Sequence, residues 1–340
     1  MRPKSETVSM KSAKVLIVGA GLMGRWHAFS AIRSGATIVA VVDPRLERAE
    51  ALQREFGAEK SFQNLQDCLK ESKSNIAHIC TPVDQHLDAI EMCLTHGQHV
   101  LAEKPLLSTL EATRRILTQA HESGLKLAPV HQMPFQRGAA KLAESHLNLG
   151  RIIRASHTAF TSGGDGKSEP ERMEVLLEIL PHPVSLFFRL FGEKLDVSQF
   201  NVRRYFDGEL EIDGLVDDTL LRISVSLRGR PTRNELTVVG DKASAHIDLF
   251  HGFATYESGE VSKRSKILKP FRFGSNLVLD ASRNLIQRSA SNEVAYPGLR
   301  TLIRQFYRSA LEGKPAPISE KEILLCAELA DKVRLSKTDK

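Results

Sequence analysis

Six consecutive residues, 19–24, have the types and spacing needed to bind the phosphates of a dinucleotide. They read Gly-Ala-Gly-Leu-Met-Gly and directly follow the apolar run 15–18. In such a turn Gly19 permits a tight reversal, Gly21 lets the backbone approach a pyrophosphate, and Gly24 lets the following helix lie close to the strand. The pattern therefore predicts a dinucleotide-binding strand, turn and helix. The alternative is a structural turn that binds no ligand.

The residues around these glycines indicate which dinucleotide is bound. Leu22 and Met23 open the predicted helix, whose free N–H groups and partial positive charge face the phosphates. Asp43 ends the next predicted strand, where its carboxylate can accept hydrogen bonds from ribose hydroxyls and would repel a 2′-phosphate. Arg45 could instead pair with such a phosphate. We therefore expect NAD as the cofactor, with NADP as the alternative.

The elements that must position these residues follow from the hydrophobic pattern. Up to residue 130, short apolar runs alternate with helical stretches, which is typical of βαβ units in a doubly wound parallel sheet. The expected strands are 15–18, 37–42, 75–80, 99–102 and 126–130, and the expected helices are 22–33, 44–56, 84–96 and 109–123.

From residue 131 onward, strand-like segments follow one another and predict an α/β domain with an open mixed, largely antiparallel sheet. Glycines such as Gly208 and Gly214 are interpreted as turns between the strands. The expected elements are strands 152–160, 197–206, 219–227, 235–239, 243–250 and 253–257, a helix over 173–191 and helices near the end. We expect a flexible leader over 1–12, a Rossmann domain over 13–130, a substrate-binding and oligomerisation domain over 131–340, and a flexible tail over 336–340.

The composition is that of an ordinary globular protein. The 340 residues are 41 % hydrophobic and 26 % charged, with a formal net charge of +6, which excludes collagen-like and wholly disordered chains. The apolar run 15–23 is too short to cross a bilayer, and the N-terminus has no signal-peptide pattern, so we expect a cytoplasmic protein. The four cysteines lack metal-site spacing and predict buried thiols, with no metal bound.

Three further motifs stand in a fixed order downstream of the glycine turn. They are Thr81-Pro82 with His86, Glu103-Lys104-Pro105-Leu106, and Glu178 with His182. Over about residues 14–336 this ordered set resembles the Gfo/Idh/MocA family of oxidoreductases. The resemblance implies hydride transfer between nicotinamide C4 and a secondary alcohol or ketone of a sugar, cyclitol or related polyhydroxylated substrate, which can be anionic.

The resemblance also implies roles for individual residues. Lys104 and His182 would handle the proton, with His182 as the principal acid/base because imidazole titrates near neutral pH, and Lys104 as its polarising partner. Glu178 would orient His182 or bind a substrate hydroxyl. Contacts to the cofactor are expected from Thr81, Pro82, His86, Glu103 and Lys104. The implied assembly is a homodimer or homotetramer formed through the C-terminal sheet.

This chain departs from the family pattern where Glu178 and Ser185 replace aspartates, which predicts a reshaped site. Pro181 and Pro183 are expected to prevent a regular helix at His182. Weaker candidates for substrate contact, at the expected cleft after the last Rossmann strand or in a late segment, are His131, Gln132, Arg137 and Tyr296. Trp26 and His27 are expected to border the nicotinamide end.

Residues 263–308 carry ten basic and two acidic side chains. A solvated helix face explains such a bias, and attraction for an anionic substrate is the alternative. Aromatic residues are sparse there, so we expect no nucleic acid as a partner. Since no apolar run is long enough to span a bilayer, we expect no membrane partner either. Two other functions stay open for the chain: a redox-neutral epimerase or glycosidase that uses tightly bound NAD, and a dinucleotide-binding regulator without catalysis.

Overall fold

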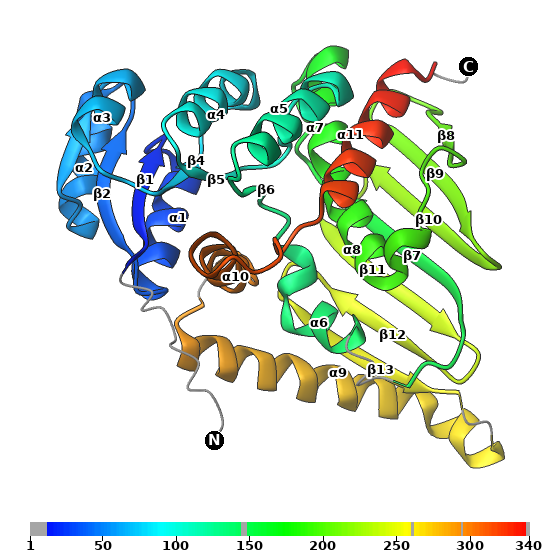
Figure 1. The fold of residues 1–340 in the computed structure, drawn as a ribbon. Helices are drawn as coiled ribbons and strands as arrows, with labels where there is room; N and C mark the ends of the chain where they lie inside the picture. The colour runs from blue at the N-terminus through cyan, green and yellow to red at the C-terminus, as the bar shows by residue number, and fades with distance from the viewer. Residues whose placement is uncertain (1–11, 144–147, 260–261, 294, 338–340) are drawn as a thin grey trace, which may run out of the picture. The chain divides into compact units, whose positions relative to one another are not determined.

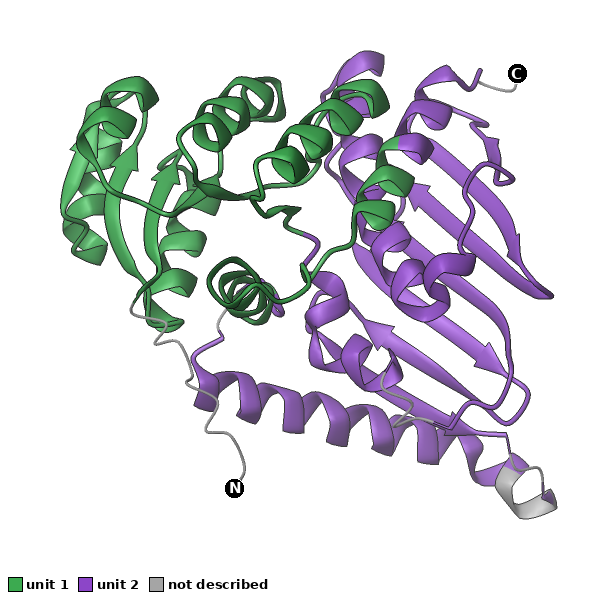
Figure 2. Cartoon of the chain, viewed as in Figure 1, with its two compact units in different colours: residues 1–130, 299–327 green, residues 131–298, 328–340 purple. Residues whose placement is uncertain are grey.

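The computed structural model describes residues 12–143, 148–259, 262–293 and 295–337. The chain divides into two compact units, shown in Figure 2. Unit 1 lies within residues 1–130 and 299–327, and unit 2 within residues 131–298 and 328–340.

Unit 1 contains a six-stranded sheet in the order β3-β2-β1-β4-β5-β6, in which every neighbouring pair is parallel (Figure 1). This is the doubly wound arrangement that the alternating pattern predicts. The elements are β1 (Lys14–Val18), α1 (Leu22–Arg33), β2 (Thr37–Val42), α2 (Leu46–Phe56), β3 (Lys60–Phe62), α3 (Leu65–Glu71), β4 (Ile76–Ile79), η2 (Val83–Gln85), α4 (His86–Thr95), β5 (His99–Ala102), α5 (Leu110–Glu122) and β6 (Leu127–Pro129).

The sequence pattern does not indicate β3 and α3 because they have only three and seven residues, too few for a clear hydrophobic period. The segment 299–327 is a second difference, because it clusters with unit 1 although its sequence position suggested the second domain. Its helix α10 (Leu299–Glu312) packs on α1 and buries Leu302, Phe306 and Tyr307 in unit 1. Helix α11 (Glu320–Leu335) follows it.

Unit 2 contains a seven-stranded mixed sheet in the order β13-β12-β11-β7-β10-β9-β8. Only β7 and β10 pair in parallel among its described strands, so the sheet is largely antiparallel, as expected. The elements are η3 (Met133–Phe135), α6 (Arg137–Ala143), β7 (Ile152–Phe160), α7 (Glu169–Ile179), α8 (Pro181–Phe191), η4 (Gly192–Lys194), β8 (Asn201–Arg203), β9 (Glu209–Val216), β10 (Thr219–Ser226), β11 (Arg233–Gly240), β12 (Ala243–Asp248), β13 (Phe253–Ser258) and α9 (Lys263–Ser291).

The expected strand over 197–206 is wrong. Only Asn201–Arg203 is a strand there. Strand β9 follows it and contains Gly214, a residue expected to form a turn. Gly214 explains the error, because it lies inside β9 where a Cβ atom would come within 2.2 Å of the Phe200 ring. The glycine makes room for this aromatic side chain instead of reversing the chain.

The expected helix over 173–191 is two helices, α7 and α8, joined at Leu180. Helix α7 begins earlier than predicted because Ser168 and Glu171 form a reciprocal capping box. The stretch Glu169–Lys194 is long and apolar enough by composition to span a bilayer, but 56 % of its apolar window is buried. Its burial is that of a core helix pair of unit 2.

Candidate functional site

The glycine turn has a close backbone packing that only glycine can satisfy at two of its three positions. Gly19 has a φ of +99°, and a Cβ atom there would lie 2.7 Å from the carbonyl oxygen of Cys80. A Cβ atom at Gly24 would lie 1.9 Å from the carbonyl oxygen of Gly19. Gly21 differs, because a Cβ atom there would meet nothing within 4 Å. The turn is therefore closed against the protein and open at Gly21.

Asp43 holds the turn from the end of β2. Its side chain is buried, and its Oδ2 accepts a hydrogen bond of 2.9 Å from the N–H of Ala20. Oδ1 accepts a second one of 3.0 Å from the N–H of Arg45. The exposed guanidinium of Arg45 lies 3.9 Å from the same oxygen. Each carboxylate oxygen has two lone pairs, so Asp43 can brace the turn and also accept a hydrogen bond from a ligand.

These residues fit a dinucleotide. Gly21 is the N-cap of α1, no side chain caps that helix, and its first turn contains no acidic residue, so its N–H groups and dipole suit an anion. The space above Gly21 would be filled by any side chain placed there. Across the described residues, the Thr81 hydroxyl at the end of β4 is one of the buried polar atoms without a hydrogen-bond partner. A bound ligand can supply that partner.

His86 has a different place from the one expected, because both of its ring nitrogens bind the protein itself. One nitrogen, Nε2, lies 2.9 Å from the carbonyl oxygen of Thr81, and Nδ1 lies 3.0 Å from that of Leu106. The side chain is buried. His86 thus joins the segment after β4 to the segment after β5, and it positions both instead of contacting a ligand.

A buried chain of four polar side chains joins α10 to the end of β5. Tyr307 Oη lies 3.2 Å from His78 Nε2, and His78 Nδ1 lies 3.0 Å from His27 Nδ1. His27 Nε2 in turn lies 3.0 Å from Glu103 Oε1. The N–H of Lys104 donates to Glu103 Oε2 over 3.2 Å. We call Tyr307, His78, His27 and Glu103 the buried polar network.

Charge fixes the direction of the hydrogen bond at Glu103. An ionised Glu103 only accepts, so His27 donates to it from Nε2. In the tautomer with a hydrogen on Nε2 alone, His27 accepts at Nδ1 and His78 donates from its own Nδ1. His78 is left with Nε2 as an acceptor for the Tyr307 hydroxyl. One tautomer of each histidine therefore satisfies all three side-chain hydrogen bonds.

Three pKa shifts bear on this network. Burial alone would raise the pKa of the Glu103 carboxyl, but the hydrogen bond from His27, the charges of His27 and Lys104 and the hydrogen bond from the Lys104 N–H together outweigh burial and lower that pKa. Burial lowers the pKa of His78 well below its ordinary value, so its imidazole is neutral. Burial also raises the pKa of Tyr307 well above its ordinary value, so its hydroxyl keeps the proton it donates.

This network changes the interpretation of two residues. His27 was expected to border the nicotinamide, but it is fully buried and its ring contacts only the interior of unit 1 through His78 and Glu103. Glu103 was expected to contact the cofactor, yet both of its oxygens accept hydrogen bonds from the protein. Lys104 is half-buried and follows directly. The network thus fixes the backbone from which the Lys104 side chain extends.

In unit 2, Glu178 and His182 differ in exposure. Glu178 is exposed near the end of α7, whereas His182 is 8 % exposed in the first turn of α8. The expectation that Pro181 and Pro183 prevent a helix here is wrong, because the first turn of a helix has no N–H partner to lose and accepts proline. Ser185 Oγ donates to the carbonyl oxygen of His182 over 2.9 Å.

The weaker candidates lie in separate places within unit 2. His131 is buried and Gln132 half-buried at the start of the unit. The Arg137 guanidinium donates to Gln287 Oε1 over 2.5 Å and lies 3.5 Å from Ser291 Oγ, so it contacts α9. Tyr296 is half-buried and has a φ of +50°.

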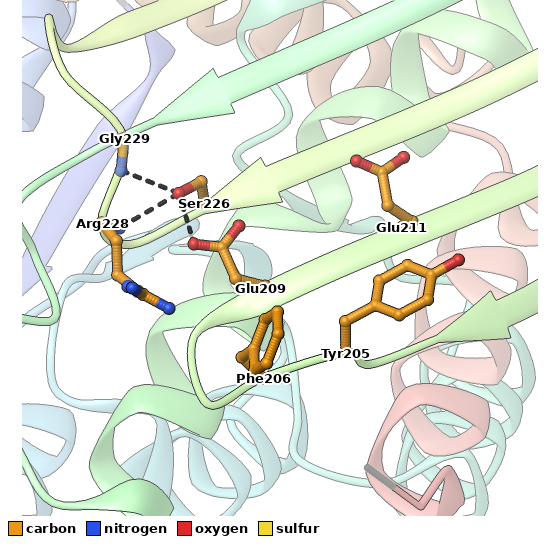
Figure 3. Close-up of a pocket in the computed structure, with 7 residues that line it drawn as sticks. All are labelled: Tyr205, Phe206, Glu209, Glu211, Ser226, Arg228 and Gly229. Carbon is orange, nitrogen blue, oxygen red and sulfur yellow. Dashed lines mark hydrogen bonds between the residues drawn. The ribbon is translucent and has the colours of Figure 1, made fainter. Parts of the chain in front are cut away.

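Two hollows of unit 2 contain none of the predicted site residues. The first, of about 540 Å³, is shown in Figure 3 and is lined by Tyr205, Phe206, Glu209, Glu211, Ser226, Arg228 and Gly229. Its Ser226 hydroxyl donates to Glu209 and accepts from the N–H groups of Arg228 and Gly229. The second, of about 490 Å³, lies beside it and shares Phe206 and Arg228. In the described part of the chain, no group of three or more His, Cys, Asp or Glu side chains is arranged to hold a metal ion.

Residues 13–131 match the model of an oxidoreductase family with an NAD-binding Rossmann fold, the Gfo/Idh/MocA family. Among characterised relatives, D-glucoside 3-dehydrogenase of Escherichia coli is 33 % identical over 153 residues, 42 % of this chain and 44 % of that protein. The scyllo-inositol 2-dehydrogenase (NAD(+)) of Bacillus subtilis is 32 % identical over 111 residues, 32 % of each chain. The matches thus span less than half the length of these relatives.

Solved structures share the fold over nearly the whole chain. The WlbA dehydrogenase of Bordetella pertussis, in complex with NADH and UDP-GlcNAcA, has a TM-score of 0.74 at 15 % identity and covers 96 % of both chains. The UDP-N-acetylglucosamine 3-dehydrogenase GnnA of Acidithiobacillus ferrooxidans has a TM-score of 0.72 at 18 % identity, covering 95 % of this chain and 97 % of that one. The predicted fold class, a Rossmann sheet with a second mixed sheet, is confirmed.

Proposed function

We propose that the chain, whose residues 13–131 match the model of the Gfo/Idh/MocA oxidoreductase family, is an NAD(P)-dependent dehydrogenase or reductase. The observation that carries the proposal is the glycine turn, closed at Gly19 and Gly24 and open at Gly21. A purely structural turn has no need of the uncapped N-terminus of α1 above that opening. When bound there, the nicotinamide cofactor supplies or accepts the hydride.

The cofactor contacts of this proposal come from the turn and the strand ends beside it. Leu22 and Met23 offer backbone N–H groups to the phosphates, and Thr81 offers its buried hydroxyl. Asp43 accepts from the ribose and disfavours a 2′-phosphate, which supports NAD over NADP. Pro82 shapes the backbone beside Thr81, while His86 and Glu103 act by positioning.

The proton would be handled by Lys104 and His182. Lys104 extends from a backbone held by Glu103, so its ammonium can polarise a substrate oxygen from a fixed point. His182 starts from a rigid, buried helix turn whose carbonyl group is held by Ser185, and an imidazole can take or return the hydroxyl proton near neutral pH. Glu178, which is exposed, would bind a substrate hydroxyl. The weaker candidates for substrate contact are His131, Gln132, Arg137 and Tyr296.

The substrate class follows from the relatives. The names of the characterised proteins above specify a glucoside and a cyclitol, and those of the structural neighbours specify nucleotide sugars. We therefore propose a secondary alcohol or ketone of a sugar, cyclitol or related polyhydroxylated compound. The overall charge of +6 is compatible with an anionic member of this class.

Cofactor reduction across a substrate panel tests the proposal. The purified protein is incubated with NAD or NADP and with glucosides, inositols and UDP-sugars, and the near-ultraviolet absorbance of reduced nicotinamide is followed. We expect reduction with at least one panel member and a higher kcat/KM with NAD. Product formation without net cofactor reduction would instead indicate the redox-neutral enzyme, and cofactor binding without any product would indicate the regulator.

We also propose self-association through the second sheet. Along β9, which lies next to the edge strand β8, the buried residues alternate with Glu209, Glu211, Asp213 and Leu215, and Leu215 is 60 % exposed. An exposed leucine on such a face favours contact with a second copy. Sedimentation velocity tests this: the wild type should sediment as a dimer or tetramer, and Leu215→Glu should shift it toward the monomer. A monomeric wild type would contradict the proposal.

A further inference from the structure

Helix α9 packs against its own unit with a polar face. It lies beside β13 in Figure 1. Asn284 Nδ2 donates to the carbonyl oxygen of His251 over 2.8 Å, and Gln287 Oε1 accepts from Arg137. The one aromatic contact among the described side chains of this face is that of Phe273, whose ring lies 5.6 Å from the ring of His246. Hydrogen bonds therefore hold most of the helix in place.

Most of the large apolar side chains of α9 point away from this packing face, on which Phe273 lies. Five of them are between 64 % and 74 % exposed, and we call them the apolar stripe: Ile267, Phe271, Val278, Leu285 and Ile286. At about 100° of rotation per residue, the first four fall within an arc of about 40°. Asn284 lies more than about 90° outside that arc. The stripe and the packing face are thus different faces of one helix.

This arrangement inverts the usual one. A surface helix of a globular protein buries its apolar stripe and exposes its polar face. Here hydrogen-bonding residues face the protein while a phenylalanine and four aliphatic side chains face outward along the helix. Contiguous exposed apolar surface of this kind marks a site of interaction.

The charge of α9 indicates the partner. Residues 263–291 contain seven Lys and Arg and one Asp, a formal charge of +6 that equals the net charge of the whole chain. The rest of the chain has 40 basic and 40 acidic residues and is formally neutral. Exposed bases that flank the stripe are Lys266, Arg272 and Arg283, whereas Lys269 lies 3.7 Å from Glu257 of β13. A partner for this surface must therefore be both anionic and able to accept apolar side chains.

We propose that α9 is a docking surface for an anionic lipid bilayer. The helix would lie in the plane of the interface, with the apolar stripe entering the boundary between headgroups and acyl chains and the Lys and Arg side chains reaching lipid phosphates. This proposal departs from the sequence-based expectation of no membrane partner. It concerns peripheral binding and leaves the oxidoreductase site in its own place.

The observations favour lipid over the other occupants. A second copy of α9 would bring two helices of +6 together, and like charges oppose that contact. A folded acidic protein would need a groove that matches a convex helix about 44 Å long. A fluid bilayer adapts to such a helix and supplies many negative charges.

Vesicle cosedimentation of the full chain tests the proposal. The vesicles contain phosphatidylcholine alone or a 7:3 mixture with phosphatidylserine, at low and high salt. We expect at least tenfold tighter binding to the anionic vesicles, and weaker binding at high salt because exposed charges are screened. Equal binding to both vesicle types, or none to either, would overturn the proposal.

Matched variants separate the two parts of the surface. Val278→Ser should weaken vesicle binding, whereas Leu335→Ser, which changes an exposed aliphatic residue of α11, should leave it unchanged. Arg272→Gln with Arg283→Gln should weaken binding about 30-fold, and Arg48→Gln on α2 should not. If Val278→Ser instead lowers the mass in sedimentation velocity and leaves vesicle binding intact, the stripe is a contact between copies and the proposal is wrong.

Discussion

Two regions of unit 1 position the candidate site in opposite ways. The glycine turn is formed by six consecutive residues and works because side chains are missing from it. The buried polar network is formed by four side chains from α1, β4, the end of β5 and α10, and its Tyr307–His78 hydrogen bond spans 229 positions of the chain. Both regions reach α1, since Gly24 and His27 lie one turn apart on it.

The two regions differ in the kind of substitution that disrupts them. The turn fails sterically, when an added atom meets backbone that cannot move. The network is disrupted when a substitution removes one member and leaves its buried partner without a hydrogen bond. A change in the turn should therefore act on cofactor binding and packing together, whereas a change in the network should act on stability and on the position of Lys104.

The largest effect should come from Gly24→Val. Its Cβ atom would lie 1.9 Å from the carbonyl oxygen of Gly19, so the turn must open, with a loss of about 3 kcal/mol or more in the free energy of unfolding. Chemical denaturation measures the stability, and fluorescence titration with NADH measures the affinity, which should fall more than about 100-fold.

Gly21→Ala is the matched variant within the same turn. Its Cβ atom enters open space, so stability should stay the same while NADH affinity falls at least tenfold through a clash with the bound phosphates. Unchanged affinity would show that the opening above Gly21 does not hold the cofactor.

The contrast between the regions also explains what the sequence could predict. The turn, Asp43 and the order of the parallel strands depend on residues that are adjacent or regularly spaced, so the pattern alone indicates them. The network depends on contacts across the fold, and His27 and His78 carry no local signal of their partners. The sequence does not indicate the role of Gly214, because that role depends on its contact with Phe200. It does not indicate the break between α7 and α8 either, because a new helix begins there at Pro181.

Acid should weaken the network, whereas residues 19–24 themselves contain no titratable side chain. The pKa of His78 is lowered in the folded protein, so the unfolded chain binds the extra proton first, and stability is lost as the pH falls below about 6.5. Lowering the pH from 6.5 to 5 should therefore reduce the free energy of unfolding through this residue. The lowered pKa of Glu103 adds a further loss below about pH 4.5, as the pH approaches its folded value.

Urea denaturation at several pH values measures this loss, and His78→Leu should make the dependence shallower. His157 in unit 2 is the comparison, because burial lowers its pKa to about 4 and gives it a similar contribution between pH 6.5 and 5. If His78→Leu keeps the full wild-type pH dependence, His78 is not a neutral member of the network.

Tyr307→Phe should cost about 1–2 kcal/mol in the free energy of unfolding, because it leaves the buried His78 Nε2 without its donor. Tyr256→Phe is the control, since its hydroxyl donates at an exposed position over 3.3 Å and its removal should cost less than about 0.5 kcal/mol. Equal losses from the two variants would contradict the role given to Tyr307.

The smallest effect is expected from Asp43→Asn. The amide can still accept from the N–H of Ala20 but no longer repels a 2′-phosphate, so the preference for NAD over NADP should fall roughly fivefold, which is about 1 kcal/mol. The ratio of the two kcat/KM values measures it. An unchanged ratio would place the basis of cofactor choice elsewhere.

The central claim is that Lys104 and His182 serve hydride transfer at the cofactor held by the glycine turn. The most direct measurement is the turnover of NAD with the substrate found in the panel, for Lys104→Ala, His182→Ala and the exposed control His121→Ala, alongside NADH affinity. We predict that kcat falls about 10²- to 10⁴-fold in the first two variants and stays unchanged in the control, with NADH affinity for His182→Ala within about twofold of the wild type. Wild-type turnover in either Lys104→Ala or His182→Ala would contradict the claim.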